Sequence, residues 1–451
     1  MELKNKKILV IGLGKTGIET CHFLSEQGSK IAVTDEIEQK CLDLCHDFKK
    51  LNIDIDYLPY EKSDFSTADL IVLSPGVPHT LPQIIEAQKK GSFVIGEIEL
   101  ASWFIKEPVI AITGTNGKTT TTTLIGNILN YSKIDSFVGG NIGNPLISYV
   151  RKKEKSKIIV LEVSSFQLDT IINFRPDVSI LLNITEDHLD RYADMDYYAQ
   201  SKMKIFKNQR PVDYAIINGE DKYIKKFNIS SQVICYNCQN NNSRNIEIND
   251  KSIILPFAKW EIDISKLKIH GKHNYENIAA AAAASWAKGA DFDAVKKALY
   301  NFNGLEHRIE FVKNINGVDF YNDSKATNID AAIKAVSSFK NSSIRLIMGG
   351  RDKGGDYKIL EPFFINNLVQ LLVIGEARDK ILNAFSNITN NIDVKDMGFD
   401  PDALERSVKL AFSCSKPGDT ILLSPACSSF DMFKSYVDRG NHFKKIVNEI
   451  L

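Results

Sequence analysis

The sequence has 451 residues, and its 56 basic and 56 acidic side chains give a formal net charge of zero at pH 7. This balance provides no general attraction for nucleic acid or for an anionic membrane surface, so a small-molecule substrate is favoured. The length is typical of about three domains, and no apolar run approaches the roughly 20 residues that a membrane-spanning helix requires.

A glycine-rich turn follows the first predicted strand. The motif GLGKTG occupies residues 12–17, a helix is predicted to follow it, and a second strand ends at Asp35. This pattern is typical of dinucleotide-binding βα units, in which a diphosphate rests on the helix N-terminus, but alone it does not say which nucleotide binds. Buried strands are predicted from four apolar runs, at residues 7–11, 30–34, 70–73 and 93–95. We therefore predict a Rossmann-like domain over residues 1–97.

The next predicted strand and helix enclose a second glycine-rich loop. An apolar run at residues 108–112 precedes it, and apolar side chains at helical spacing follow it. Glycines in such a loop let backbone N–H groups surround phosphate oxygens, while Lys118 reaches the terminal phosphates and the Thr119 hydroxyl holds Mg²⁺. The usual pattern has glycine where this sequence has Ile112, so the loop is a shortened form; an ordinary glycine turn before a helix is the alternative. The predicted phosphate contacts are Gly114, Thr115, Asn116, Gly117, Lys118, Thr119 and Thr120.

Charged side chains then follow two predicted strands at their carboxyl ends, where open parallel sheets bind ligands. Glu162 lies inside the apolar run of residues 158–163, and a buried carboxylate there requires a cation or several donors. The strand predicted at residues 178–184 runs into the motif TEDHLDRY. From the residues alone, His188 in this motif is a general base, a manganese ligand or a histidine satisfied within its loop. We predict a central P-loop α/β domain over residues 98–303.

Seven cysteines are scattered along the chain, as in a reducing cytoplasm, where we expect the protein to reside. Cys235 and Cys238 form one CxxC, but no second pair completes a zinc site. We therefore interpret this pair as a coincidence on the surface. The surrounding segment, residues 221–266, is polar and rich in asparagine, and it is expected to form hairpins or loops.

Strand-like runs alternate with helical patterns in the last third of the chain. Three of these strands end in loops of polar or small residues: NDSKATN at 322–328, GGRDKGGD at 349–356 and SPACSSFDMF at 424–433. The alternation predicts a second doubly wound, Rossmann-like α/β domain over residues 304–451. The whole chain is thus predicted to be an α/β protein of three domains.

Eight motifs occur in one order over the whole chain and together resemble the Mur ligases. They are GTNGKTT, LEVSSFQL, TEDHLDRY, the spacing from Tyr198 to Lys202, GKHNYEN, EHRIE, NDSKATN and SPACSSFDMF. Mur ligases are ATP-dependent amide ligases of peptidoglycan precursor synthesis, and the last two motifs are similar to those of members that add D-glutamate. The resemblance implies that ATP activates the carboxylate of UDP-N-acetylmuramoyl-L-alanine as an acyl phosphate, from which D-glutamate displaces phosphate. Another Mur-type or a folylpolyglutamate-type ligase is the alternative.

The resemblance also implies a catalytic centre of four side chains, Lys118, His188, Lys202 and Lys325. Two Mg²⁺ ions, with Mn²⁺ as an alternative, are expected on Thr119, Glu162, His188 and Lys202. Histidine is an unusual ligand for Mg²⁺, which prefers oxygen. Lys202 is expected as a carbamate, because two nearby metal ions would repel a free ammonium; a solvated helix lysine is the alternative.

Three binding sites follow from the resemblance. Beyond the phosphate loop, Asn277, Arg308 and Asp323 are expected to bind ATP. The alternatives are that Asn277 caps a helix and that Asp323 is a turn residue. The residues expected to bind the UDP-sugar are Gly14, Lys15, Thr16, Asp35, Ser74, Asn141, Gln167 and His188. The residues expected to bind D-glutamate are Thr327, Lys353, Ser429 and Tyr436.

The sequence departs from the family pattern at two places. Glu36 and Ile37 follow Asp35 where threonine and arginine are expected, so the expected arginine contact to the uracil has no residue to make it. Tyr436 replaces the usual phenylalanine, which is harmless if the backbone makes the contact. Beside Lys353, residues 351–352 could equally form a surface ion pair.

Two other functions compete with a ligase. The hypothesis of a nicotinamide-dependent oxidoreductase is based on GLGKTG and Asp35, but it leaves the phosphate loop and the third domain unexplained. A non-catalytic ATP-binding switch leaves Glu162, His188 and the polar strand ends of the third domain unexplained. For the ligase we expect a monomer with a hinge near residues 302–304 that closes on the nucleotide.

Overall fold

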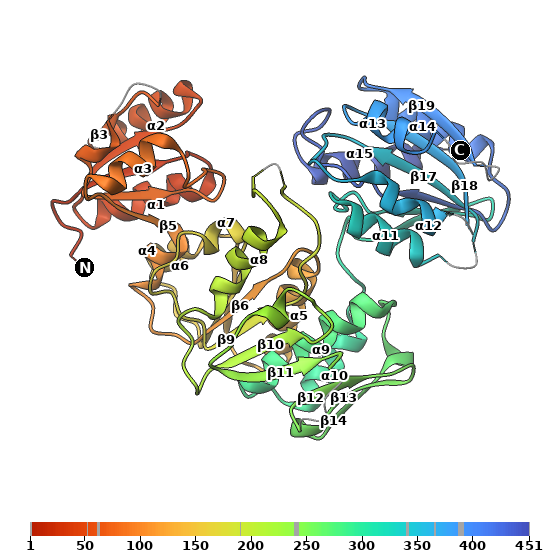
Figure 1. The fold of residues 1–451 in the computed structure, drawn as a ribbon, viewed down its shortest axis with the longest axis horizontal. Helices are drawn as coiled ribbons and strands as arrows, with labels where there is room; N and C mark the ends of the chain where they lie inside the picture. The colour runs from red at the N-terminus through yellow and green to blue at the C-terminus, as the bar shows by residue number, and fades with distance from the viewer. Residues whose placement is uncertain are drawn as a thin grey trace. The chain divides into compact units, whose positions relative to one another are not determined.

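The computed structural model describes residues 2–51, 53–60, 64–189, 191–238, 243–339, 342–364, 367–386 and 392–450. The chain divides into two compact units. The first unit consists of Met1–Ile184, Tyr198–Leu267 and Tyr275–Asn301, and the second of Thr185–Tyr197, Lys268–Asn274 and Phe302–Leu451. Within the described ranges, two sheets belong to the first unit and one to the second (Figure 1).

The N-terminal sheet is parallel, with the strand order β3-β2-β1-β4-β5. Its strands are β1 (Lys7–Ile11), β2 (Lys30–Thr34), β3 (Ile55–Tyr57), β4 (Leu70–Leu73) and β5 (Phe93–Gly96). The helices are α1 (Lys15–Glu26), α2 (Glu38–Lys50) and α3 (Pro82–Lys89). Because the strands are covered by helices, they read as near-continuous apolar runs, and this is why four of them were predictable. The short strand β3 was missed.

The middle sheet has the order β14-β13-β12-β11-β10-β9-β6-β8-β7. Its parallel part comprises β6 (Val109–Thr113), β7 (Ser136–Gly140), β8 (Ile158–Glu162), β9 (Val178–Leu181), β10 (Tyr214–Asn218) and β11 (Gln232–Tyr236). The last three strands are β12 (Asn245–Ile248), β13 (Ser252–Leu255) and β14 (Trp260–Asp263). β12 joins β11 in parallel, and β13 and β14 continue as antiparallel hairpins, as predicted for this segment, whose residues 239–242 lie outside the described residues.

The helices of the middle part connect these strands. They are α4 (Glu97–Ser102), α5 (Lys118–Tyr131), α6 (Leu146–Lys152), α7 (Ser165–Leu168), α8 (Met195–Met203), α9 (Lys272–Ala287) and α10 (Phe292–Tyr300). The alanine-rich stretch of α9 is fully buried from Ala279 to Ala284. Small side chains allow this helix to pack closely on its neighbours, in agreement with the predicted close-packed helix.

The sheet of the second unit has the order β15-β16-β20-β17-β18-β19. Its strands are β15 (Glu310–Ile315), β16 (Val318–Asn322), β17 (Ile344–Gly349), β18 (Leu368–Ile374), β19 (Asp393–Gly398) and β20 (Thr420–Leu423). The helices are α11 (Ile329–Ser337), α12 (Glu361–Phe364), α13 (Arg378–Ala384), α14 (Ala403–Ser413) and α15 (Tyr436–Glu449). Residues of α11 and α13 share one apolar core and residues of α14 and α15 share another, so helices cover both faces of the sheet.

The predicted fold class is confirmed: each of the three sheets is an α/β layer with helical crossovers. The boundaries at residues 97 and 303 stay predictions, although the division between the units at Asn301 and Phe302 falls beside the predicted hinge. Within the described ranges, every helix falls short of the length and apolarity needed to cross a membrane.

Candidate active site

The predicted phosphate loop connects β6 to α5, the strand–loop–helix order that the sequence indicated. Gly117 caps α5 with a φ of 87°, in the left-handed region that favours glycine. A Cβ at this position would also lie 2.3 Å from the Oδ1 of Asn277, so glycine is required for two reasons. The Nζ of Lys118 donates to the carbonyl oxygens of Gly114 and Thr115, each at 2.8 Å. The ammonium thus lies at the mouth of its own loop.

The structure brings Lys202 to the same loop. Its Nζ donates to the carbonyl oxygen of Gly114 at 2.9 Å and lies 4.5 Å from the ring centroid of Tyr198. The hydroxyl of Tyr198 is in turn 3.3 Å from the Oγ1 of Thr115. Lys202 is only 1% exposed, so the alternative of a solvated helix lysine is wrong. Both predicted catalytic lysines of this unit therefore meet on one carbonyl group.

Asn183, which sequence reasoning missed, holds the backbone of the phosphate loop. It follows β9, and its side chain accepts from the N–H of Asn116 at 2.9 Å and donates to the carbonyl of Asn116 at 3.1 Å. Its position directly after a buried strand was the signal that could have identified it. Asn277 lies in the second turn of α9, which begins at Lys272, so the alternative of a helix cap is also wrong.

Glu162 ends β8, the strand next to the phosphate-loop strand, and pairs in register with Ile112. Its Oε1 accepts from the Nδ2 of Asn141 at 2.8 Å. Its Oε2 is buried and has no hydrogen-bond partner among the residues that the structure describes. An orphaned carboxylate oxygen beside a phosphate loop fits Mg²⁺, which prefers oxygen ligands and is usually completed by phosphates and water. No group of three or more His, Cys, Asp or Glu side chains suited to a metal occurs in the described ranges. A metal ion at Glu162 would therefore need phosphate oxygens and water as its further ligands.

In the N-terminal sheet, Asp35 organises the GLGKTG turn. Its carboxylate accepts from the backbone N–H groups of Leu13 at 2.6 Å and Ile37 at 3.0 Å. Burial alone would raise the pKa of this carboxyl, but these N–H groups and Lys40 together hold the pKa below its ordinary value. Ser74 fixes the other side of the turn by donating to the carbonyl of Gly12 at 2.6 Å.

A cavity of about 440 Å³ lies over this turn. Its lining includes the residues predicted here for the UDP-sugar, Gly14, Lys15, Thr16, Asp35 and Ser74. The expected arginine is absent, and Ile37 at its position is 54% exposed. The lining nevertheless includes a second lysine, Lys40, besides Lys15.

Lys15 and Gln167, both predicted for the sugar nucleotide, have structural partners within the first unit. The Nζ of Lys15 donates to the carbonyl of Gly143 at 2.8 Å and to the Oδ1 of Asn144 at 2.9 Å. Gln167 forms a capping box with Ser164 at the start of α7, where its Oε1 accepts from the Ser164 N–H at 2.9 Å. The side-chain amide oxygen of Gln167 therefore orients the turn that follows β8.

Asp323 follows β16 in the second unit and is buried. Burial raises the pKa of its carboxyl to about 7, against the opposing effects of the Ser424 hydroxyl, the Arg308 guanidinium and the Ile309 N–H. The Ser424 hydroxyl donates to it at 2.8 Å and the Ile309 N–H at 3.2 Å. The structure thus brings the two predicted nucleotide residues of this unit, Asp323 and Arg308, into one electrostatic group.

Arg439 in α15 is a second residue that sequence reasoning missed. It is fully buried and donates to the carbonyls of Ser324 at 2.8 Å, Cys427 at 3.1 Å and Gly349 at 3.4 Å. These carbonyls belong to the loops NDSKATN, SPACSSFDMF and GGRDKGGD, so one guanidinium ties three predicted site loops together. Burial lowers its pKa to about 10. Its spacing from Phe443 on one helix face was the only sequence signal.

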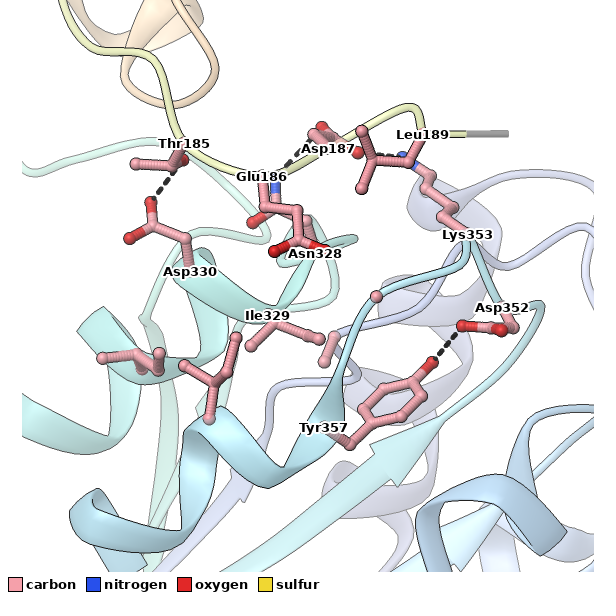
Figure 2. A pocket seen from close by; sticks show the side chains of 14 residues that line it. Thr185, Glu186, Asp187, Leu189, Asn328, Ile329, Asp330, Asp352, Lys353 and Tyr357 are labelled. Atoms are coloured by element: carbon pink, nitrogen blue, oxygen red, sulfur yellow. Dashed lines mark hydrogen bonds and ion pairs between the residues drawn. The ribbon is translucent and has the colours of Figure 1, made fainter. Parts of the chain in front are cut away.

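A cavity of about 190 Å³ is lined in part by residues of all three loops, and Figure 2 shows its lining. Lys353 points toward Asp187, and its Nζ lies 3.3 Å from the Oδ1 of that carboxylate. Asn328 donates to the Oδ2 of Asp187 at 3.1 Å. This cation and amide therefore already form a carboxylate-binding arrangement inside the second unit.

His188 follows Asp187 and has a φ of 56°. Its Nε2 lies 3.7 Å from the Oδ2 of Asp187, and its side chain is 30% exposed. The bend places the predicted metal-binding histidine next to the carboxylate that contacts Lys353. His188 belongs to the second unit, whereas Glu162 and Lys202 belong to the first.

Of the remaining predicted D-glutamate residues, Thr327 and Ser429 lie on these loops, and Tyr436 is the first residue of α15. The Nζ of Lys325 is 5.1 Å from the ring centroid of Tyr436, and the Oγ of Ser324 donates to the Tyr436 carbonyl at 2.8 Å. The backbone carbonyl of Tyr436 thus makes a contact. A backbone contact is the case in which the change from phenylalanine to tyrosine is expected to be harmless. Ser429 is buried in the SPACSSFDMF loop, and Thr327 is half-buried in NDSKATN.

Arg351 and Asp352 do not pair with each other but with other partners. Arg351 lies 3.1 Å from Glu376 and Asp352 lies 2.7 Å from Lys380. The expectation of an ion pair between residues 351 and 352 is therefore wrong, because each of the two side chains pairs with a residue outside the motif.

Comparisons with known proteins cover the chain almost completely. Residues 6–96 match the Mur ligase MurD-like N-terminal domain, residues 112–285 the Mur ligase middle domain, and residues 307–427 the Mur ligase glutamate ligase domain. A UDP-N-acetylmuramoylalanine–D-glutamate ligase of Desulfatibacillum aliphaticivorans is 41% identical, with all of both chains covered. One of Geotalea uraniireducens is 43% identical, with 100% of this chain and 99% of the relative covered.

Solved structures agree on the fold. The UDP-N-acetylmuramate-alanine ligase MurC from Thermotoga maritima has a TM-score of 0.60 at 19% identity, over 98% of this chain and 99% of the other. The MurF ligase from the same organism, solved in complex with ADP, has a TM-score of 0.60 at 17% identity, over 100% and 97%. Taken with the domain matches and the full-length relatives, these likenesses lead to one conclusion: the chain belongs to the Mur ligase family.

Proposed function

We propose that this protein is an ATP-dependent, ADP-forming ligase that joins D-glutamate to UDP-N-acetylmuramoyl-L-alanine in peptidoglycan precursor synthesis. The observation that carries the proposal is its identity of 41–43% with full-length relatives of that name. The convergence of Lys118 and Lys202 on the phosphate loop supports it from the geometry. An oxidoreductase would use neither lysine in this way.

The chemistry follows from the weakness of hydroxide as a leaving group. A carboxylate condenses with an amine only after the γ-phosphoryl group of ATP has been transferred to it, which forms an acyl phosphate and ADP. The amine of D-glutamate then attacks the acyl carbon, and inorganic phosphate leaves. Phosphoryl transfer depends mainly on positioning and on neutralising charge, and Lys118 supplies both at the loop mouth.

Thr119 and the orphaned Oε2 of Glu162 would hold one Mg²⁺, and His188 and Lys202 would take part in a second site. Bound there, the ions neutralise charge that develops on the phosphates. The chain's own contribution is to orient Glu162, because Asn141 fixes one of its oxygens and leaves the other available.

Lys202 is proposed as a carbamate. Its ammonium would first lose one proton, and the free amine would then attack carbon dioxide, forming an N–C bond and releasing a second proton, so that a cation becomes an anion. A buried ammonium next to two metal ions would be costly, whereas a carbamate would bind their water shells. The burial of Lys202 against Tyr198 supports this assignment.

D-Glutamate carries two carboxylates, which call for cationic and hydroxyl donors. Lys353, Thr327 and Ser429 would bind them, with the backbone at Tyr436, and Lys325 would neutralise the acyl phosphate. The pairing of Lys353 and Asn328 with Asp187 supports this site, because those two donors already bind a carboxylate of the protein itself. The UDP-sugar would occupy the cavity over the GLGKTG turn, and ATP would contact Asn277, Arg308 and Asp323.

The decisive experiment is a phosphate-release assay with UDP-N-acetylmuramoyl-L-alanine and ATP. Release is expected with D-glutamate but not with L-glutamate, L-alanine or diaminopimelate, and the amide product should be visible by mass spectrometry. Equal release without either co-substrate would contradict the proposal. We further propose that the enzyme works as a monomer in the cytoplasm, which light scattering and cell fractionation test.

A further inference from the structure

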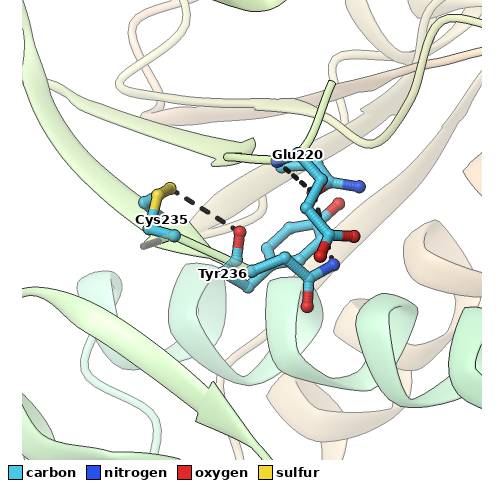
Figure 3. Close-up of a disulfide and its surroundings, with 6 residues drawn as sticks. Glu220, Cys235 and Tyr236 are labelled. Carbon is cyan, nitrogen blue, oxygen red and sulfur yellow. Dashed lines mark hydrogen bonds between the residues drawn. A yellow bond between two sulfur atoms is a disulfide. The ribbon is translucent and has the colours of Figure 1, made fainter. Parts of the chain in front are cut away.

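The middle sheet carries a pair of cysteines outside the site described above. Cys235 lies in β11 and is 4% exposed, and the half-buried Cys238 follows it closely. Their sulfurs are joined in a disulfide with the Cα atoms 6.0 Å apart, in the usual range of about 4.4–6.8 Å (Figure 3). The interpretation of this CxxC as a surface coincidence is therefore wrong.

Gly219, at the end of β10, makes room for both sulfurs. A Cβ there would lie 2.3 Å from the Sγ of Cys238 and 2.7 Å from the Sγ of Cys235. The φ of Gly219 is outside the left-handed region, so its backbone conformation does not require glycine. The absence of a side chain instead serves the close approach of the two cysteines, which is a second observation in favour of a built site.

Reagents can reach the pair. Both cysteines line a cavity of about 480 Å³, whose wall also includes Lys225 and Phe227. Thiol–disulfide exchange requires access to at least one sulfur, and the half-buried Cys238 is the more accessible of the two. A small thiol therefore has room to enter.

The two residues between the cysteines both hold parts of the nucleotide site. Tyr236 is fully buried, and its hydroxyl donates to the carbonyl of Leu182 at 2.9 Å. Leu182 directly precedes Asn183, which brackets the backbone of Asn116 in the phosphate loop. A single hydrogen bond thus connects Tyr236, inside the CxxC, to the residue that precedes Asn183.

Asn237 makes the second connection. It has a φ of 56°, and its Nδ2 donates to the Oε1 of Glu276 at 2.8 Å. The next residue, Asn277, packs its amide against Gly117 of the phosphate loop. The ring closed by the disulfide holds Asn237 in its bent conformation, so opening the ring would loosen the contact to α9.

We propose that Cys235 and Cys238 form a redox-modification site whose state sets the affinity of the phosphate loop for nucleotide, an inference that rests on the proposed use of ATP. In the oxidising direction, the two thiols react with one low-molecular-weight disulfide. One protein S–S bond forms, the S–S bond of the reagent breaks, and the two protons leave with two reagent thiols. The cysteines lose two electrons, which the reagent gains. The oxidised form binds nucleotide more tightly.

The first experiment measures the site itself. The full chain is equilibrated with mixtures of reduced and oxidised glutathione, alkylated and weighed by mass spectrometry. In the parent, we expect a transition that protects two thiols together from alkylation. The same transition is expected in Cys414→Ser, because Cys414 is exposed and is not part of a disulfide. Cys238→Ser should show none, and Gly219→Ala should require an oxidant ratio at least about tenfold higher. Absence of the transition in the parent, or an unchanged ratio in Gly219→Ala, would overturn the proposal.

The second experiment measures the consequence. Calorimetric titration with a non-hydrolysable ATP analogue and Mg²⁺ should give about fivefold weaker binding after reduction. Cys238→Ser should bind like the reduced parent under both conditions, and Cys414→Ser like the parent. Equal affinities in both redox states would overturn the inference even if D-glutamate-dependent phosphate release is intact. Absence of that release in both states, with the affinity difference present, would instead contradict the proposed function alone.

Discussion

At the residue scale, the proposed function depends first on Lys118. Its ammonium contacts the carbonyls of its own loop, and the proposal places the terminal phosphates of ATP at this loop. We expect Lys118→Ala to lower ADP formation by about 100-fold or more, because one preorganised charge on the transferred group is lost. Binding of the UDP-sugar, measured by calorimetry, should be unchanged.

Lys133→Ala is a suitable control for this variant, because Lys133 is an exposed lysine just beyond the other end of α5. It should retain parental turnover. Normal ADP formation in Lys118→Ala would remove this lysine from the mechanism.

The proposed carbamate gives Lys202 a distinctive response. Lys202→Ala should lose activity, and small carboxylic acids such as acetate should restore part of it by supplying the missing anion in the buried space beside Tyr198. Turnover is measured over a range of acid concentrations. Lys118→Ala serves as the control and should show no recovery; if Lys202→Ala shows none either, the carbamate is not supported.

At the scale of elements, α4 and α6 meet through a buried carboxyl. The Oε1 of Glu97 accepts from the N–H of Ile147 at 2.6 Å, and burial raises the pKa of this carboxyl from 4.5 to about 7. The folded state therefore holds the proton more tightly than the unfolded state. Its stabilising contribution is complete below about pH 4.5 and is lost as pH rises to 7, a difference of about 3 kcal/mol.

We accordingly expect Glu97→Gln to flatten the decline of stability between pH 5 and pH 8. Glutamine retains an acceptor for the Ile147 N–H but does not ionise. Denaturant midpoints at several pH values test this, with the exposed Glu154→Gln as a control that should follow the parent. Parallel pH curves for Glu97→Gln and the parent would rule out the buried carboxyl as the cause.

Helix α15 fixes the loops of the third sheet through one arginine. Arg439→Met would leave the carbonyls of Ser324 and Cys427 without their donor, at a cost of about 2–4 kcal/mol. Hydrogen exchange should accelerate in peptides from these loops, and the KM for D-glutamate should rise more than kcat falls. The exposed Arg406→Met is the control. Unchanged exchange in the loops would contradict this positioning role.

At the scale of the molecule, the division between units falls at Asn301 and Phe302, next to the predicted hinge. A nucleotide bound by residues from both units, such as Asn277 and Arg308, would favour a closed arrangement. We expect small-angle scattering to show a smaller radius of gyration with an ATP analogue and Mg²⁺ than without them. AMP should leave the profile unchanged, and an identical profile with the analogue would argue against closure.

The α/β class, the phosphate loop and most strands could be predicted from the residues alone, because buried parallel strands are continuous apolar runs and glycine loops carry local signatures. The loops of the candidate site could be predicted as well, since ligands bind at the carboxyl ends of such strands. The orphaned oxygen of Glu162, the burial of Lys202 and the contact of Arg439 with three loops became visible only in the folded chain. The room that Gly219 leaves for the sulfurs of Cys235 and Cys238 belongs to the same group. Each depends on residues far apart in sequence, whose proximity and loss of water no local pattern encodes.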